Sequence, residues 1–331
     1  MKTTLYSILA AAACGMAFGQ TAYTNPVGYT TQVLKPSAFS YLGLTVNNAV
    51  VSAGIIDAVS ASPKSVTDTG INFSTLLTAG ATYILELNDG TIQEITSWTS
   101  LGVLNTPEDI TSKITAGVTE YKLRKAATIA DIFGVNNSAG LTADSDGSYA
   151  TGNDLIYVLN STGVPTIIYY SLGGEEAPAG WYTSGDVPAG NIPLVYSDGF
   201  YVKRSAGINV SLVMSGEVKL KPTAGVLIPG YNYMSSVSPA GLTLGNSGLE
   251  NYLSQSVNGA PFTTVDNVLV PTATGFTICY YSTGGEEAPA GWYTSGDASA
   301  SLVNLEGGFL IRNRGVAKPY KINIPISYSN L

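Results

Sequence analysis

The chain has 331 residues, of which 11% are charged and 45% are hydrophobic, and its formal net charge is −8. A typical soluble domain has about 25% charged residues. In this chain the missing charged residues are replaced by Gly, Ser, Thr, Asn and Tyr. This composition favours strands and turns. The chain contains no His, which excludes His-dependent triads, proton shuttles and zinc sites. The two Cys and the few basic residues exclude a thiolate metal cage and a nucleic-acid-binding surface.

Residues 1–19 are predicted to form a secretory signal peptide. Lys2 supplies a positive charge, and the run 5–13 is mostly apolar but too short to span a bilayer. Ala17-Phe18-Gly19 places small residues at the positions that favour cleavage before Gln20. We therefore expect a secreted protein, extracellular or on the outer cell surface, with the periplasm as a further possibility.

Cys14 supports an alternative interpretation of the leader. Ala11-Ala12-Ala13-Cys14 is a degenerate lipoprotein box that lacks the usual Leu. If Cys14 is removed with the leader, Cys279 is the single remaining Cys and lies in an apolar strand pattern, so we expect a buried, inert thiol. No later apolar run approaches the length of about 18 residues that a membrane-spanning helix needs.

The first elements after the leader are predicted between residues 73 and 124. Apolar residues recur at helical spacing over 73–77, which predicts a short helical turn. Asn88-Asp89-Gly90 separates the runs 83–87 and 91–95, and this turn chemistry predicts a β-hairpin. The run 120–124 predicts a strand with a basic end.

A second group of elements follows residue 126. Helical spacing predicts a turn at 129–133, and apolar runs predict strands at 153–160 and 199–204. The runs 209–213 and 216–220 predict a second hairpin, although the two residues between them are not favoured turn residues. In a third group, a helical turn at 249–253 precedes strands at 265–270 and 308–312.

The strongest pattern in the chain is an internal repeat. Residues 169–186 and 280–297, called the twin segments below, are identical except at Leu172 and Thr283. Such identity indicates a duplication rather than chance. We expect both segments to have the same backbone shape on equivalent edges of two modules.

Three modules are predicted from this repeat and from the three tryptophans, which fall one per module at Trp98, Trp181 and Trp292. The predicted boundaries are 22–125 for a degenerate first module, 126–222 for the second and 223–331 for the third. We expect a mostly β fold, with tandem β-sandwich or barrel-like modules that each contain one short helix.

Several of these motifs resemble a family of uncharacterised secreted proteins that is expanded as paralogues in verrucomicrobial bacteria. The resemblance is carried by Asn25-Pro-Val-Gly-Tyr29, the run 128–134, the strand 153–158 and the two runs 199–204 and 216–219; Tyr169-Tyr170 and Gly180-Trp181 add to it. It covers most of the mature chain. It implies bacterial origin and export, and it implies no reaction and no ligand.

The twin segments supply the candidate ligand-binding residues. Each contains two Tyr, two Glu, one Trp and one Asp: Tyr169, Tyr170, Glu175, Glu176, Trp181 and Asp186 in the first, and Tyr280, Tyr281, Glu286, Glu287, Trp292 and Asp297 in the second. Aromatic rings stack on sugars and carboxylates accept hydrogen bonds from hydroxyls, so the segments are candidate glycan-binding loops. The alternative is a purely structural segment whose Trp folds back into the module.

Two further sites are weaker. A glycosidase needs two carboxylates about 5–10 Å apart, but adjacent Glu175 and Glu176 on an extended chain point in opposite directions. Asp144, Asp146 and Asp154 have the spacing of the start of a calcium loop but lack its remaining ligands, so an acidic surface turn is the alternative. We expect no other cofactor.

The sequence therefore favours an exported, non-enzymatic structural or adhesion protein of the cell surface. Its partners would be glycans or other surface proteins. A carbohydrate-binding module array and a secreted glycoside hydrolase are the alternatives. A buried Trp in each twin segment favours the structural role, an exposed one favours glycan binding, and a cleft with converging carboxylates favours an enzyme.

Overall fold

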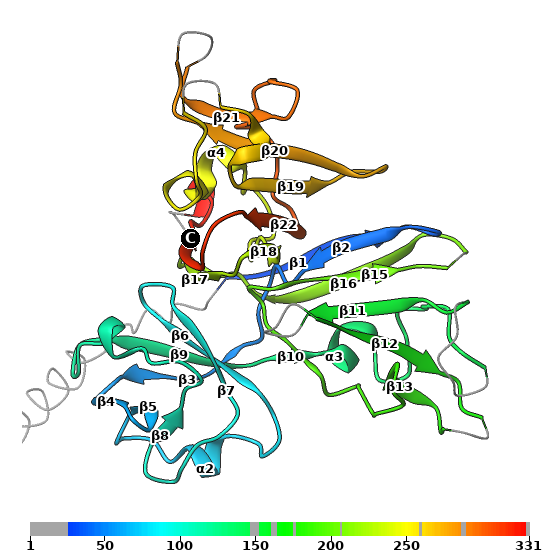
Figure 1. The fold of residues 1–331 in the computed structure, drawn as a ribbon. Coiled ribbons are helices and arrows are strands. Elements are labelled where there is room, and N and C mark those ends of the chain that lie inside the picture. Colours follow the sequence, from blue (N-terminus) through cyan, green and yellow to red (C-terminus); the bar gives the residue numbers. More distant parts are fainter. Residues whose placement is uncertain are drawn as a thin grey trace, which may run out of the picture.

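The structure, a computed structural model, describes residues 26–145, 152–159, 164–174, 177–205, 207–257, 260–285 and 289–328. Among these residues the strands pair in antiparallel fashion and form two five-stranded sheets and several smaller ones. The predicted mostly β fold is therefore confirmed. Figure 1 shows three lobes, which we call the first, second and third units in chain order.

The first unit contains a four-stranded sheet in the order β3-β9-β6-β7 and a three-stranded sheet in the order β4-β5-β8. Its elements are β3 (Val50–Ile55), β4 (Ala58–Ala61), β5 (Lys64–Thr67), α2 (Phe73–Leu76), β6 (Tyr83–Leu87), β7 (Ile92–Ile95), β8 (Val103–Asn105), the 3-10 helix η1 (Thr111–Lys113) and β9 (Glu120–Lys125). The predicted helical turn is α2, whose Phe73 is fully buried. The predicted hairpin is confirmed as β6–β7, and Gly90 takes a φ of 96° in its turn.

The second unit is built around a five-stranded sheet in the order β13-β12-β11-β15-β2. Its elements are β1 (Val27–Leu34), β2 (Phe39–Gly43), β10 (Ala127–Thr128), α3 (Ile129–Phe133), β11 (Leu155–Leu159), β12 (Pro165–Ser171), β13 (Gly180–Thr183), β14 (Pro193–Leu194), β15 (Gly199–Lys203) and β16 (Val210–Glu217). The predicted turn at 129–133 is α3, which begins at a capping box of Thr128 and Asp131.

The unit boundaries differ from the predicted modules 22–125 and 126–222. β2 pairs with β15, and β1 pairs with β16 over its whole length, as Figure 1 shows. Leu34 and Leu42 accordingly belong to the hydrophobic core of the second unit. The first unit is therefore an insertion between β2 and β10, and the linear spacing of repeats does not reveal a strand that returns from so far upstream.

The predicted hairpin of residues 209–213 and 216–220 is wrong. One continuous strand, β16, runs through Met214 and Ser215, because β1 supplies backbone partners along its full length. Met214 is 5% exposed and belongs to the core of the second unit, which an exposed turn would not allow. The absence of favoured turn residues at Met214 and Ser215 thus agrees with a continuous strand.

The third unit contains a five-stranded sheet in the order β18-β22-β19-β20-β21. Its elements are β17 (Thr223–Leu227), β18 (Gly230–Ser235), α4 (Leu244–Ser247), η2 (Leu249–Asn251), η3 (Phe262–Thr264), β19 (Asn267–Pro271), β20 (Phe276–Ser282), β21 (Gly291–Thr294), β22 (Gly308–Asn313), β23 (Lys318–Ile322) and η4 (Ile326–Tyr328). The predicted turn at 249–253 begins as η2. The sheet repeats the strand order of the second unit, with β18 in the place of β2 and β22 in the place of β15.

The two five-stranded sheets contact each other reciprocally at these strands. A Cβ at Gly199 on β15 would lie 2.6 Å from the carbonyl oxygen of Met234 on β18, and one at Gly308 on β22 would lie 2.4 Å from that of Leu42 on β2. Ser235 joins the sheets, since its backbone amide donates to Ser197. Glycine is required at positions 199 and 308 because the backbones approach too closely for a side chain.

A buried ionic cluster joins the first unit to the second. Lys219, which follows β16, lies 3.0 Å from the Glu86 carboxylate on β6, and its ammonium also donates to the carbonyl of Pro222 at 2.6 Å. Arg124 on β9 pairs with Glu217 on β16. Burial lowers the pKa of Lys219, and Glu86 opposes this shift. Because both ions of each pair are mostly buried, the cluster fixes the orientation of the first unit.

Candidate functional site

The two tryptophans of the twin segments lie inside their units. Trp181 on β13 is 4% exposed and Trp292 on β21 is 2% exposed. Tyr170 packs edge-on against Trp181 with ring centroids 4.9 Å apart, and Tyr281 packs against Trp292 at 5.5 Å. Both pairs have the same register, on edge strands in the same position of the two sheets. Both tryptophan rings are therefore core residues and are not accessible to a sugar.

The indole nitrogens distinguish the two sites. Trp181 Nε1 donates to the carbonyl of Gly134, the residue that ends α3, at 2.8 Å. Trp292 Nε1 is buried and has no acceptor within the described part of the chain. Gly248 ends α4 in the third unit, and its carbonyl already accepts hydrogen bonds from the backbone and side-chain amides of Asn251. The two cores thus differ by one hydrogen bond.

The Tyr and Asp residues at the ends of the twin segments pair with each other. Tyr169 donates to Asp186 at 2.9 Å, and Tyr280 donates to Asp297 at 2.8 Å. Both aspartates have a φ of 61°, in the left-handed region. Burial, followed by the hydrogen bond to Asp297, raises the pKa of Tyr280 to about 12. Each pair fixes the turn after its edge strand, so these side chains have a structural role.

The four glutamates of the twin segments, at positions 175, 176, 286 and 287, lie outside the described residues, as does Asp146. Asp144 is 5% exposed, and its backbone bridges to Ser171 on β12. The predictions for these glutamates and for a calcium loop therefore stay predictions.

Asp154, the third residue of the predicted calcium loop, forms a buried ion pair. Its carboxylate accepts a hydrogen bond from Arg204 Nε at 2.8 Å, from the amide of Thr142 at 2.8 Å and from the amide of Ser205 at 2.7 Å. Asp154 is 1% exposed. Its oxygens therefore already bind a cation supplied by the protein.

Asp266 has the same role in the third unit. Its carboxylate accepts from the backbone amides of Ser254 and Arg314, both at 2.7 Å, and pairs with Lys318. Burial would raise the pKa of Asp266, but the hydrogen bonds from Lys318 and the two amides outweigh burial and lower it. In both units a buried aspartate thus ties a loop to the strand that closes the sheet.

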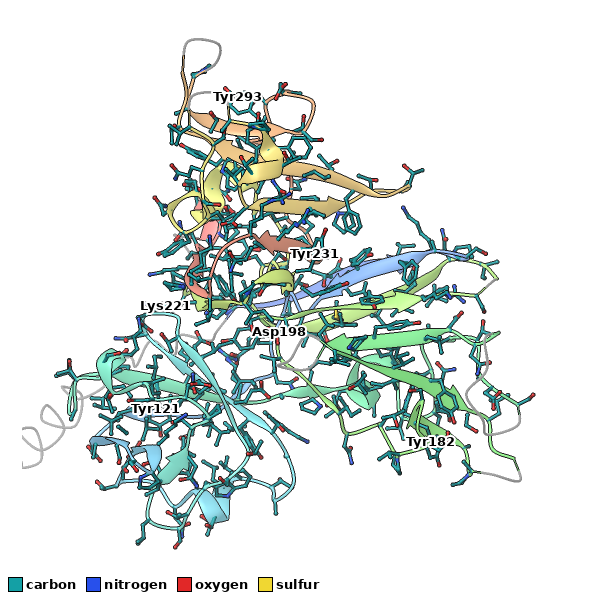
Figure 2. The ribbon with its side chains drawn as sticks, viewed as in Figure 1. Tyr121, Tyr182, Asp198, Lys221, Tyr231 and Tyr293 are labelled. Atoms are coloured by element: carbon teal, nitrogen blue, oxygen red, sulfur yellow. The ribbon has the colours of Figure 1, made fainter. Side chains whose placement is uncertain are left out.

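A different group of residues lines a cleft where the three units meet, and we call it the central cleft. Its volume is about 450 Å³. Residues of all three units line it, among them Glu94 of the first, Thr166, Asp198 and Phe200 of the second, and Tyr231 and Tyr233 of the third. Figure 2 shows Asp198 at the meeting point of the lobes, with Tyr231 on the side of the third unit.

Asp198 and Glu94 are the carboxylates of the central cleft. Asp198 lies immediately before β15, is accessible to solvent, and accepts a hydrogen bond from Ser197 Oγ at 3.0 Å. Burial between the cleft walls, together with the charge of Glu94, raises the pKa of Asp198 to about 6, although the bond from Ser197 opposes the shift. Burial also raises the pKa of Glu94. The cleft therefore disfavours both negative charges.

Stacked tyrosines lie beside the cleft. The rings of Tyr157 and Tyr201 stack with centroids 4.5 Å apart, and Tyr233 stacks on Tyr201 at 5.4 Å. Burial, followed by its three tyrosine neighbours, raises the pKa of Tyr201 to about 12. Tyr231 is 49% exposed, and the Arg312 guanidinium lies 5.4 Å from its ring centroid. The wall formed by the third unit is thus aromatic, and Arg312 packs on the Tyr231 ring without lining the cleft itself.

No sequence motif indicated the central cleft. Glu94 and Asp198 are far apart in the sequence and belong to different units, so no motif connects them. The available local signal was an acidic residue, Asp198, directly before the strand of Gly199 and Phe200.

Cys279 is a free thiol with no exposed surface, on β20, and burial raises its pKa to about 11. The prediction of a buried thiol is confirmed. Within the described ranges, no Cys, Asp and Glu residues gather in a group of three that could hold a metal ion. In the same ranges no helix has the length and apolar character needed to cross a membrane.

Comparisons with family models, with curated proteins and with solved structures gave no match to the chain.

Proposed function

We propose that the protein is an exported, non-enzymatic structural or adhesion protein of the cell surface. The burial of Trp181 and Trp292 carries this proposal. The most distinctive side chains of the twin segments pack inside their own units, where they stabilise the sheets. A glycan-binding array would instead present these rings to solvent.

The packing between the units also supports a structural role. A structural protein has to hold its parts in fixed positions under load. The reciprocal contact at Gly199 and Gly308 and the buried pairs of Lys219 with Glu86 and of Arg124 with Glu217 supply such fixation. Transient domain contacts are more polar and more exposed.

Export is part of the proposal and is supported by the sequence. Residues 1–19 have the pattern of a signal peptide, and the resemblance to a family of secreted proteins agrees with it. The same signal peptide is needed for secretion to the medium, for retention on the outer surface and for a periplasmic location.

Surface labelling of intact native cells tests the proposal. A membrane-impermeant amine-reactive biotin is expected to label the protein on intact cells, and deletion of the gene is expected to reduce attachment to surfaces or to weaken the envelope. A strain with restored expression is the control. A protein found only in the cytoplasm, or a deletion with unchanged attachment and envelope, contradicts the proposal.

A further inference from the structure

The central cleft contains two carboxylates and no compensating cation. Glu94 comes from β7 of the first unit, and Asp198 comes from the turn before β15 of the second. No Lys or Arg is among the described residues that line the cleft. From the described part of the chain, no hydrogen bond or ion pair reaches the Glu94 carboxylate, and Asp198 receives only the hydroxyl of Ser197.

This arrangement is unlike the other acidic residues at the centres and junctions of the units. Asp154 is paired with Arg204, Asp266 with Lys318, and Glu86 with Lys219. In those places the chain itself supplies the cation. In the central cleft no Lys or Arg among the described lining residues offsets the two carboxylates, which are open to solvent and repel each other, so a cation from outside would be stabilised there.

The walls of the central cleft are suited to an aliphatic stem. Val158, Ile192, Val226 and Ile228 line it together with the rings of the third unit. Its volume of about 450 Å³ lies in the range of about 300–1,000 Å³ that is usual for small-molecule sites. Two carboxylates in a cleft with apolar walls form the combination that accepts a long side chain with a positive end.

We propose that the central cleft binds a ligand with an aliphatic stem that ends in a primary ammonium or a guanidinium, as in lysine and arginine side chains. The positive group lies between Asp198 and Glu94, and the stem lies along the apolar walls. The proposal goes beyond the structural role above and does not depend on it.

The charge of Asp198 makes binding dependent on pH. Asp198 has a pKa of about 6, and the titratable groups that face it are Glu94 on β7, Tyr320 on β23, and Tyr231 and Tyr233 on β18. Burial raises the pKa of Tyr233 and of Tyr320, so both stay neutral below pH 8. Binding of the cation is therefore strongest above pH 7 and weakens as the pH falls through about 6 and Asp198 takes up a proton.

Calorimetric titration of the purified chain with two isosteric probes is the first test. n-Butylamine and n-butanol have the same stem and nearly the same size but differ in charge. At pH 7.5 we expect n-butylamine to bind one site at least about tenfold more tightly than n-butanol, and we expect this preference to decrease at pH 5. Equal binding of the two probes, or a preference that is unchanged at pH 5, overturns the proposal. This comparison uses the unmodified chain, so it stands even if a variant fails to fold.

Two isosteric variants locate the site. Asp198→Asn and Glu94→Gln are each expected to weaken n-butylamine binding at least about tenfold. Glu108→Gln is the matched control, since Glu108 is an exposed acid outside the cleft, and it is expected to leave binding unchanged. Thermal melts of each variant show whether it is folded. If the control weakens binding as much as the cleft variants do, binding reflects net charge alone and the proposal is wrong.

Peptide probes distinguish the source of the ligand. Acetyl-Gly-Lys-Gly-amide that binds at least about tenfold more tightly than n-butylamine indicates a lysine presented by a partner protein. Comparable affinities indicate a free amine. In both cases acetylation of the lysine Nε is expected to abolish binding, and an acetylated peptide that binds as well as the unmodified one overturns the proposal.

Discussion

Gly199 and Gly308 begin corresponding strands of the two five-stranded sheets, and each lies against the edge strand of the other sheet. Gly199 faces the backbone of Met234 on β18, and Gly308 faces the backbone of Leu42 on β2. Leu42 and Met234 are themselves corresponding residues, since each pairs with the Phe that follows the glycine, at positions 200 and 309. The second and third units therefore meet through the same surface on both sides.

Alanine at either glycine is expected to push the sheets apart. The new Cβ of Gly308→Ala would lie 2.4 Å from a backbone oxygen, which cannot move as a side chain can. We expect a loss of about 2–3 kcal/mol of unfolding free energy for Gly308→Ala, and a similar loss for Gly199→Ala. Urea denaturation measures both. Gly275→Ala is the control, since no atom lies within 4 Å of its added Cβ, and a loss as large as that of Gly308→Ala would contradict the close-contact explanation.

The buried tryptophans give a matched pair of conservative variants. Trp181→Phe removes a hydrogen bond to the Gly134 carbonyl, which keeps only the backbone amide of Asn137 as a donor, whereas Trp292→Phe removes a buried donor that has no acceptor within the described residues. An unsatisfied buried polar group costs about 1–3 kcal/mol. We therefore expect Trp181→Phe to destabilise the protein by at least about 1 kcal/mol more than Trp292→Phe does. Chemical denaturation decides this, and equal losses would show that the indole hydrogen bond contributes nothing.

Lys219 is expected to be more important for stability than an exposed lysine. Lys219→Met leaves Glu86 buried with Arg124 at 4.0 Å and a hydrogen bond from the Tyr196 hydroxyl at 3.2 Å, and breaking a buried pair in this way costs about 3–5 kcal/mol. The double variant Lys219→Met with Glu86→Gln also removes the negative charge that Lys219→Met leaves without its lysine. We therefore expect the double variant to regain part of the unfolding free energy that Lys219→Met loses. Guanidinium denaturation of the two variants tests this. A double variant that is less stable than Lys219→Met would mean that Glu86 acts mainly through other partners.

Asp198 makes the protein more stable in mild acid. Its pKa is raised from 3.8 to about 6 on folding, so the folded state binds the proton more tightly than the unfolded state does. The contribution of this group to the unfolding free energy is therefore largest below pH 4 and decreases as the pH rises to about 6. The side chain is accessible to solvent, so we expect the change to be about 1 kcal/mol.

Asp198→Asn is expected to remove this contribution and to make the protein more stable at pH 7. Thermal melts from pH 4 to pH 7 compare the variant with the original chain. Parallel stability profiles would show that another group is responsible. A variant that is more stable but binds amines less well would also show that the Asp198 carboxylate lowers the stability of the protein while it contributes to binding.

Local sequence was sufficient for elements whose partners are near in the chain. The turn residues 88–90 predicted the β6–β7 hairpin because a tight turn determines the pairing of its own flanks. Helical spacing located α2 and α3 for the same reason. By contrast, the prediction of a hairpin at β16 is wrong because its partner β1 lies far upstream, and no pattern within 209–220 shows which strand pairs with it.

The candidate site depends even more on contacts between residues that are far apart in the chain, which local sequence does not show. The twin segments were visible because their residues are repeated, but the burial of Trp181 is a property of the folded unit. Asp198 and Glu94 become neighbours only when the first unit, inserted between β2 and β10, packs against the other two. Their shared cleft is a tertiary feature, and no spacing in the sequence encodes it.

Chemical denaturation of Trp181→Ala and Trp292→Ala, with a glycan-array screen of the same proteins, tests the structural role most directly. Loss of a buried Trp typically costs about 3–5 kcal/mol, which is a large share of the stability of a domain, about 5–15 kcal/mol. We expect each variant to unfold at a clearly lower denaturant concentration, with no glycan lost from the array. Unchanged unfolding midpoints together with a loss of glycan binding would contradict the structural role and would show that the twin segments are binding sites.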